Sequence, residues 1–527
     1  MIVSLPCDRS DPMRPMKALL VPSCFLLLSA CGGGGGNDGG SPGTSSNQNG
    51  NSGGNGAPVL ATVSGVVLAK SGAPVSGTDV YLFHHNDHTL AHTVTSATGT
   101  YSFSGVSTGV NTDYMIYVEQ VGYGFYPSVT DPAGHVERSD FNGRYRTVIR
   151  FAQMPAHDVT GASFTALLPT DKIASLPRTG QLISFALGDD GSIVKGVTWP
   201  ALRFTDNLDG TVSDHLTGLV WLKNAGCFTA SDWSTALAHA DALASGQCGL
   251  SDSSAAGDWR MPNVNELESL VDVSASNPAV SPLAPFTDVA LGNAYWSSTT
   301  YTALNTEAMA IRFVDGRWIN GVDPSDGSFD NAKASSLNSV WAVRSGPLGI
   351  VQVLATGVYP GIGGGSFGAG DDAALQIGAP LTDPRFIDRG DGTLVDTVTG
   401  LTWLKQGDCI HASWSDALSM ISSLASGQCG LSDGSSAGQW RLPNRNEMLS
   451  LSDRAPTFPQ AAYLDGMYQA SNAITGPVIF DHFVISDFYW TSTTDAADAT
   501  QAWSVYSCDF GVYNNPKSDL HYAFAVR

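Results

Sequence analysis

The feature that most constrains this chain is a long, cysteine-bearing pattern that occurs twice. Each occurrence contains the sequence Leu-Ala-Ser-Gly-Gln-Cys-Gly-Leu-Ser-Asp, then a Trp-Arg-Met/Leu-Pro-Asn motif, and closes on Ala-Val-Arg at Arg344 or Arg527. A repeat of roughly 180 residues is the size of a domain, whereas the unit of a solenoid is several-fold shorter. We therefore expect two homologous domains in tandem, copy 1 (176–347) and copy 2 (354–527), joined by a linker at 348–353.

The N-terminal segment is typical of an exported lipoprotein. Basic residues precede a short apolar run, after which Leu28-Ser-Ala-Cys31 resembles a bacterial lipobox. The run is too short to cross a bilayer as a mature helix. The resemblance implies that residues 1–31 are a signal peptide and that Cys31 carries lipid; an ordinary secretory cleavage nearby is the alternative. The residue after Cys31 is Gly32 and not Asp, which by the same resemblance implies retention in the outer membrane, so we expect an envelope lipoprotein that is surface-exposed or faces the periplasm.

Residues 32–58 are almost entirely Gly, Ser, Asn, Pro and Thr, which predicts a disordered tether. Such a coil reaches on the order of 30 Å from its anchor. The formal net charge of −22 repels nucleic acid and anionic lipid, so no nucleic-acid partner is expected. No second apolar stretch reaches membrane-spanning length, and we expect the lipid alone to hold the chain to a membrane.

The cysteines predict two disulfides. Cys227 and Cys248 have nearly the spacing of Cys409 and Cys429, in the same repeat context. Each bridge would close a loop of about 20 residues and contribute roughly 3 kcal/mol. A metal site would need Cys-x-x-Cys or Cys/His clusters, which the sequence lacks. Cys508 has no counterpart in copy 1; we interpret it as a buried thiol, with a reactive site or an intermolecular bridge as alternatives.

A different module occupies residues 59–155. Stretches such as Gly77-Thr-Asp-Val-Tyr-Leu-Phe83 alternate with period two, which predicts half-buried strands between Gly- and Pro-containing turns. The order of these motifs resembles carboxypeptidase regulatory-like domains, which are transthyretin-like β-sandwiches. The resemblance implies a spacer without chemistry of its own, followed by a linker at 156–175. A short histidine cluster predicts a solvated hairpin loop, with a metal site as the alternative: His84, His85 and His88.

Each copy opens with a hairpin signal. The turn Asn207-Leu-Asp-Gly210 lies between short apolar runs, and Asp-Gly suits the positive φ of such turns. Apolar residues at helical spacing predict a helix from Trp233, capped by Ser231 or Asp232. A second helix is expected to start at Pro262, since proline is tolerated in a first turn. Short strands follow, and we expect an α+β domain with two helices against a twisted antiparallel sheet.

The repeated motifs carry a resemblance to a known family. The set Arg-Phe-x-Asp-x-x-Asp-Gly-Thr, Thr-Gly-Leu-x-Trp-Leu-Lys, Trp-Arg-Met/Leu-Pro-Asn-x-Asn-Glu and Tyr-Trp-Ser/Thr-Ser-Thr-Thr resembles the Lcl C-terminal domain family in both copies. Its Trp-Arg-Leu-Pro core is similar to the formylglycine-generating-enzyme-like branch of the C-type-lectin-like fold. The resemblance implies a multidomain protein, with an all-β sandwich followed by two α+β C-type-lectin-like domains. The namesake domain belongs to an adhesin that binds host glycans, but this chain is acidic and lacks the collagen-like stalk.

Three sets of shared side chains are candidate functional residues. The helix-entrance motifs are Trp259, Arg260 and Glu266, and Trp440, Arg441 and Glu447. They suit catalysis or, more simply, an arginine–carboxylate pair that fixes the helix entrance. The shared tryptophans suit sugar stacking or core packing: Trp221, Trp259, Trp296, Trp341, Trp403, Trp440 and Trp490. Six shared aspartates could supply oxygen ligands to calcium: Asp206, Asp209, Asp214, Asp388, Asp391 and Asp396. A hairpin turn alone also explains the Asp-Gly pairs among them.

No nucleophile elbow, Ser/His/Asp order or phosphate loop recurs in both copies, so we expect no enzymatic activity and no cofactor besides this optional calcium. The sequence favours adhesion or binding of a glycan or protein ligand through the two heads. A structural component of an envelope assembly is the alternative. Ligand-facing residues are expected in 301–338 and 454–487, where the copies differ, and paired heads would add avidity.

Overall fold

The computed structural model describes residues 60–527 with internal gaps. The residues outside this description are 1–59, 85–89, 109–112, 121–122, 130–135, 141–144, 151–157, 169–170, 282–283, 303–304, 320–330, 359–369, 383, 453, 455–479, 485–486 and 508–509. The expectations for Cys31, the tether, His85, His88 and Cys508 therefore fall outside the described residues. No helix in the described part of the chain is both long enough and apolar enough to span a bilayer.

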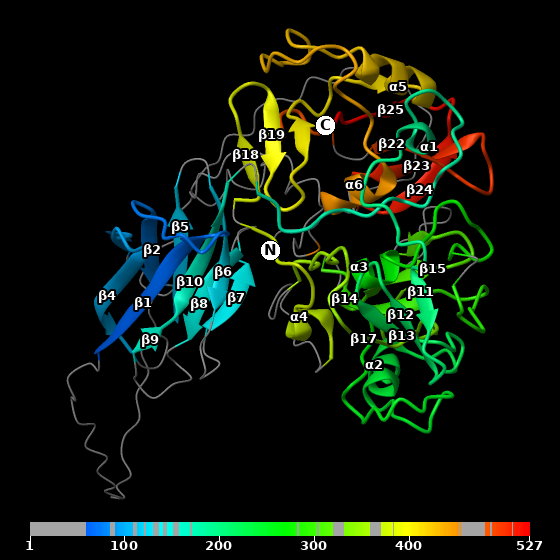
Figure 1. Ribbon diagram of the computed structural model, residues 1–527, viewed down its shortest axis with the longest axis horizontal. Coiled ribbons are helices and arrows are strands. Elements are labelled where there is room, and N and C mark those ends of the chain that lie inside the picture. The colour runs from blue at the N-terminus through cyan, green and yellow to red at the C-terminus, as the bar shows by residue number, and fades with distance from the viewer. Residues whose placement is uncertain are drawn as a thin grey trace, which may run out of the picture. The chain divides into compact units, whose positions relative to one another are not determined.

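Residues 60–167 form the predicted β-sandwich, coloured blue to cyan in Figure 1. One sheet has the strand order β4-β1-β10-β6, with β9 also paired to β1, and the other has the order β3-β2-β5-β8-β7. The strands are β1 (Leu60–Ala69), β2 (Asp79–His84), β3 (Leu90–Val94), β4 (Thr100–Ser107), β5 (Asp113–Glu119), β6 (Gly124–Val129), β7 (Val136–Asp140), β8 (Tyr145–Arg150), β9 (Val159–Thr160) and β10 (Ala162–Leu167). Val63, Val80 and Ile116 are buried in the core between the sheets.

The sandwich extends beyond the predicted boundary at residue 155. β10 pairs in parallel with β1 and antiparallel with β6, and β9 also pairs with β1. Phe164 and Ala166 are part of the sandwich core. The predicted linker at 156–175 is thus wrong for its first part, because two strands join the sheet through pairings nearly a hundred residues apart in sequence.

The two copies contain matching elements. Copy 1 contains α1 (Asp190–Ile193), β11 (Phe204–Asp206), β12 (Thr211–Asp214), β13 (Leu219–Leu222), α2 (Trp233–Asp241), α3 (Val264–Glu268), β14 (Tyr295–Thr300), β15 (Ala308–Arg312), β16 (Arg317–Ile319) and β17 (Val343–Ser345). Copy 2 contains α4 (Asp372–Leu375), β18 (Phe386–Asp388), β19 (Thr393–Asp396), β20 (Thr402–Leu404), β21 (His411–Ala412), α5 (Trp414–Ser422), α6 (Arg445–Ser450), β22 (Phe488–Thr494), β23 (Gln501–Tyr506), β24 (Val512–Pro516) and β25 (His521–Tyr522).

Local signals placed most of these elements correctly. β11 and β12 form the predicted hairpin, and Asp232 caps α2 by accepting a hydrogen bond from the Thr235 backbone. The second helix starts later than expected, at Val264, with Asn263 as its N-cap. Pro262 therefore precedes the cap, because the Asn263 side chain and the third helical residue, Glu266, form a capping box.

The predicted single antiparallel sheet is instead two small sheets in each copy. Copy 1 has the orders β11-β12-β13-β17 and β14-β15-β16; copy 2 has β18-β19-β20 and β21-β25-β22-β23-β24, in which β22 and β25 are parallel. The helices and the two sheets enclose a core of aromatic side chains. All seven shared tryptophans are 2% exposed or less, so they are core residues and present no ring face for sugar stacking.

Both predicted disulfides are confirmed. Cys227 bonds to Cys248 with a Cα–Cα distance of 5.6 Å, and Cys409 bonds to Cys429 with a distance of 5.7 Å. Both distances are typical of protein disulfides. Each bridge fastens the loop that follows α2 or α5 to the segment before that helix.

The N-terminal segment of each copy packs against the other copy, so the two segments are exchanged between the copies. We call residues 176–197 lead-in 1 and residues 354–379 lead-in 2. In Figure 1, α1 of lead-in 1 lies beside β22 of copy 2, and α4 of lead-in 2 lies beside β14 of copy 1. The sequence-based boundaries assigned each lead-in to the copy that follows it. That assignment holds for chain order only, because each lead-in makes its matched hydrogen bonds with the other copy.

Candidate functional site

The helix-entrance motif is an ion pair that also caps the helix. Arg260 donates two hydrogen bonds of 2.6 Å to Glu266, and Arg441 does the same to Glu447. Each glutamate additionally accepts the backbone N–H of its asparagine N-cap. Both oxygens of the glutamate are therefore engaged, and the geometry agrees with the structural interpretation of this motif rather than with catalysis.

The six candidate calcium ligands have other partners. Asp214 accepts both Arg203 Nε and Nη2 at 3.1 Å, and Asp396 is held in the same way by Arg385. The other four bind lysines or turn residues: Asp206 with Lys223, Asp209 with Thr211, Asp388 with Lys405, and Asp391 with Thr393. No cluster of three or more metal-ligating side chains occurs among the described residues. The two sets do not fit a calcium site, because their carboxylates already pair with arginines or lysines or accept hydrogen bonds within the turns.

The closing arginines bind the segments that follow the two disulfides. Arg344 pairs with Asp252 at 3.0 Å, and its guanidinium lies over the Trp259 ring. Arg527 matches it, with Asp433 at 2.9 Å and Trp440 beneath. The last residue of each Ala-Val-Arg motif thus ties the end of its copy to the segment that follows the second disulfide cysteine.

Asparagines at the start of α3 and α6 form hydrogen bonds with the backbone of the exchanged lead-ins. Asn263 and Asn265 of copy 1 donate hydrogen bonds to the Ile377 and Leu354 carbonyls of lead-in 2. The matching side chains of copy 2 donate to lead-in 1: Asn444 to Lys195 and Asn446 to Pro177. Both asparagines of the shared Pro-Asn-x-Asn-Glu motif therefore hold the two copies together.

A buried aspartate completes each exchanged contact. The Asp372 carboxyl accepts hydrogen bonds from Thr356 of its own lead-in and from Thr299 of copy 1, at 2.5 and 2.8 Å. Asp190 accepts the same two bonds from Thr179 and from Thr493 of copy 2. Burial raises the pKa of Asp372 to about 7 and that of Asp190 to about 6, although the threonine hydroxyls oppose this shift. We call these two contacts the aspartate clamps.

A lysine lies close to each clamp. Lys333 Nζ donates to Thr300 at 2.7 Å and lies 4.2 Å from the centroid of the Trp233 ring. Lys517 repeats this arrangement with Thr494 and Trp414. Burial lowers the pKa of Lys333 to about 8, against the opposing charge of Asp371 from lead-in 2. The pKa of Lys517 is lowered for the same reason, against Asp189 of lead-in 1.

Exposed leucines follow these lysines in both copies. Leu337 is 62% exposed and Leu520 is 60% exposed. They occupy the same place in the fold, because each directly precedes the residue that bridges to the start of the first long helix, Asn338 or His521. The copies differ in the surrounding sequence, and the match becomes visible only in the structure.

Sequence reasoning missed the clamps, the lysines and these leucines. A usable signal existed for the lysines, since each stands ten or eleven residues before the closing arginine. The Asp-Asp pairs of the lead-ins, Asp189-Asp190 and Asp371-Asp372, also recur at matched places. Neither the position of the lysines nor that of the Asp-Asp pairs indicates that these residues lie at contacts between the two copies. Of the predicted variable segments, 320–330 and 455–479 lie outside the described residues.

Two known families match parts of the chain. The Lcl C-terminal domain family matches residues 210–344 and 392–527, just over half of the chain. The chain belongs to this family. Residues 62–142 match the carboxypeptidase regulatory-like domain, which covers most of the sandwich. No curated protein matches the chain in a search of such proteins. Both matched Lcl regions begin after the lead-ins, so the exchanged segments lie outside the family match.

One contact between the two Lcl copies has no symmetric counterpart. Arg445 of α6 is 0% exposed and pairs with Glu268 of α3 at 2.7 Å. It also donates to the Gly316 carbonyl, while the Trp318 indole donates to Glu268. The matched positions in the other copy are apolar: Val264 corresponds to Arg445, and Leu449 corresponds to Glu268. We call this ion pair the charge lock.

The aspartate clamps predict an unusual pH dependence. A carboxyl whose pKa is raised by folding keeps a proton that the unfolded chain has lost, from about pH 4 to about pH 7 for Asp372. Stability therefore falls as pH rises through that window. Asp372→Asn mimics the protonated form and should remove part of this decline, on the order of 1 kcal/mol or more. Urea unfolding at pH 5 and pH 8 measures the effect. Asp519→Asn, at an exposed site, is the control, and an unchanged pH slope in Asp372→Asn would count against the clamp.

The charge lock predicts strong coupling between two substitutions. Glu268→Leu and Arg445→Val each introduce the residue of the other Lcl copy and leave one buried charge alone, at a cost of about 3–5 kcal/mol. The double variant has no unpaired charge and should cost far less than the sum of the single variants. A double-mutant cycle by urea unfolding gives the coupling energy. Additive costs would show that the two side chains do not interact.

Proposed function

We propose that this protein is a lipid-anchored bacterial envelope protein whose paired Lcl copies bind a glycan or protein ligand. The observation that carries the binding role is the matched exposure of Leu337 and Leu520, which follow Lys333 and Lys517 by four and three residues in the sequence. A single exposed leucine needs no explanation. Exposure at the matched place in two copies supports a contact surface that both heads share.

The use of the shared polar residues supports binding over catalysis. The Arg260–Glu266 and Arg203–Asp214 pairs fix a helix entrance and a hairpin, and their copy 2 counterparts do the same. The aspartate clamps join the two copies. Catalysis needs a nucleophile or an acid–base pair that reaches substrate, and these groups are instead buried among protein partners.

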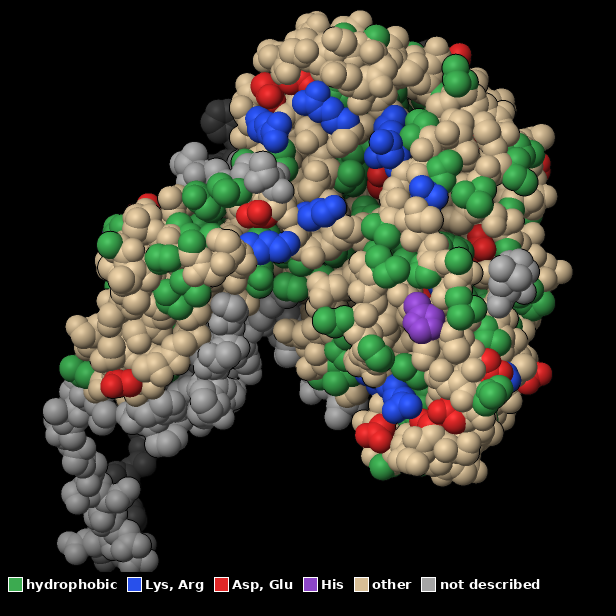
Figure 2. Space-filling view, viewed as in Figure 1, with side chains coloured by type: hydrophobic (Ala, Val, Ile, Leu, Met, Phe, Trp, Pro, Cys, Tyr) green, Lys and Arg blue, Asp and Glu red, His purple; other side chains and the backbone are tan. Residues whose placement is uncertain are grey.

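The surface composition supports recognition through close contact. Figure 2 shows a face that consists mostly of uncharged side chains, with acidic and basic side chains in small separate groups. With a net charge of −22, the protein does not attract acidic polymers over long distances. A neutral glycan or a protein ligand fits a surface of this composition better than a sulfated polysaccharide does.

The N-terminal segments support display at a membrane. The lipobox-like Leu28-Ser-Ala-Cys31, the Gly-rich tether at 32–58 and the sandwich at 60–167 would in turn provide an anchor, a flexible reach and a spacer. Two heads on one tether raise avidity, because the second binding event becomes intramolecular.

The test is retention of the purified lipoprotein on arrays of glycans and extracellular proteins. We expect saturable binding that EDTA leaves unchanged, since the aspartates do not fit calcium. Leu337→Asp and Leu520→Asp should each lower retention about tenfold or more, because either change disables one head and removes avidity. Leu208→Asp is the matched control, at a leucine that is 87% exposed on a turn.

Three results would contradict the proposal. Absence of any ligand on the arrays would exclude adhesion, and equal loss in the Leu208 control would exclude these leucines as the contact. Fixed partners that co-purify from envelope extracts, without a free ligand, would favour a structural component of an envelope assembly. Cys31→Ser tests the anchor separately, because the variant should leave the membrane fraction while it retains binding.

A further inference from the structure

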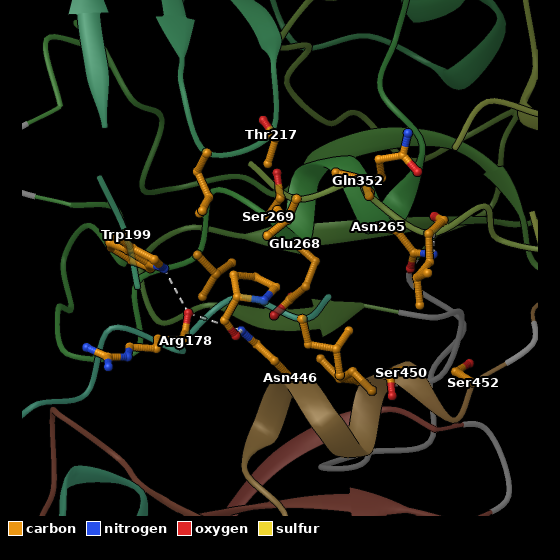
Figure 3. A pocket seen from close by; sticks show the side chains of 18 of the residues that line it. Arg178, Trp199, Thr217, Asn265, Glu268, Ser269, Gln352, Asn446, Ser450 and Ser452 are labelled. Carbon is orange, nitrogen blue, oxygen red and sulfur yellow. Dashed lines mark hydrogen bonds between the residues drawn. The ribbon is translucent and has the colours of Figure 1, made fainter. Parts of the chain in front are cut away.

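A cavity of about 90 Å³ lies between α3 of copy 1 and α6 of copy 2, and both lead-ins contribute to its walls. Figure 3 shows Asn265, Glu268 and Ser269 on one side of it and Asn446 and Ser450 on the other. We call this space the seam cavity. It lies apart from the proposed adhesion surface, since neither exposed leucine lines it.

The walls of the seam cavity are largely apolar. Leu216, Val271, Val353 and Leu449 line it, together with the indole of Trp318. An engineered apolar cavity of roughly 150 Å³ is large enough for benzene. The seam cavity is smaller, so it suits a ligand with only a few carbon atoms.

Two arginines, Arg178 and Arg203, are among the residues that line the same cavity. Arg203 is 6% exposed, and its Nε and Nη2 bind Asp214, whereas Nη1 has no hydrogen-bond acceptor among the described residues. Arg178 has a buried Nε that likewise lacks an acceptor there, and Trp199 stacks on Arg203 at 4.3 Å. A buried N–H without an acceptor costs about 1–3 kcal/mol, so a ligand oxygen that reaches it is stabilised.

The charge balance at the seam cavity favours an anion. Its only lining carboxylate, Glu268, is neutralised by Arg445 at 2.7 Å. Arg203 is likewise paired with Asp214, so Arg178 supplies the unpaired positive charge among the lining residues, within a chain of net charge −22. A planar carboxylate suits guanidinium geometry, and the apolar walls suit a hydrocarbon chain better than a fully hydrated anion such as phosphate.

We propose that the seam cavity binds a small carboxylate with a short apolar chain. The carboxylate accepts from the buried guanidinium N–H groups, and the chain packs against the aliphatic walls and Trp318. A bound ligand contacts both Lcl copies and both lead-ins, so it stabilises their association by mass action. This site does not depend on the proposed adhesion.

The experiment uses the full-length lipoprotein in detergent, with butyrate as the probe. Ligand-observed NMR and the thermal unfolding midpoint are recorded against butyramide, phosphate and sodium chloride at equal ionic strength. Saturable binding and a raised midpoint with butyrate alone are expected. Equal effects of phosphate would reduce the site to an adventitious anion contact, equal effects of butyramide would remove the role of the arginines, and no saturable effect would overturn the proposal.

Two variant pairs separate ligand binding from folding. Arg178→Ala introduces the residue that copy 2 carries as Ala355, so the unliganded midpoint should hold while butyrate binds at least tenfold more weakly. Arg203→Lys should weaken binding similarly, whereas Arg385→Lys alters the same motif in copy 2, outside this cavity, and should leave binding intact. Unchanged binding in Arg178→Ala, or equal loss in Arg203→Lys and Arg385→Lys, would overturn the assignment.

Discussion

The buried hydrogen bonds of Asp190 and Asp372 are the interaction on which the rest of the tandem depends. Each aspartate joins a threonine of its own lead-in to a threonine on β14 or β22 of the other copy. A buried carboxyl without partners is costly, so these contacts form only when both copies are folded and correctly placed. The exchange turns two successive domains into one structural unit, and the asparagines of the helix entrances then secure both lead-ins.

Local physical chemistry explains what the sequence alone could predict. The Asp209-Gly210 turn, the cap at Asp232 and the two disulfides depend on nearby residues, and the repeat supplied each of them twice. The exchange, the place of β10 and the stacking of Lys333 on Trp233 depend on partners far along the chain. Periodicity and turn motifs carry no information about such partners. The helix-entrance motif was identified, but its asparagines proved to recognise the opposite lead-in.

The contacts that both copies share come from the duplication. The preference of copy 1 for copy 2 comes from positions at which the two copies differ. The clamps, the helix-entrance pairs and the closing arginines are the same in both copies. These contacts alone would therefore also allow two domains of the copy 1 type, or two of the copy 2 type, to associate. Arg445 and Glu268 break this equivalence, since a pairing of like copies would bury one charge without its partner. The charge lock therefore favours pairing of copy 1 with copy 2. Both copies are then held in one unit, and the unequal seam between them contains the cavity.

Native-state hydrogen exchange tests most directly whether the two copies form one unit. Removal of the Cys409–Cys429 bridge destabilises copy 2 without touching copy 1. If the lead-ins are exchanged, protection of the most stable amides on β13 and β14 of copy 1 should fall together with that of copy 2, by a similar free energy. Unchanged protection in copy 1, alongside lost protection in copy 2, would show that the copies unfold independently and would contradict the exchange.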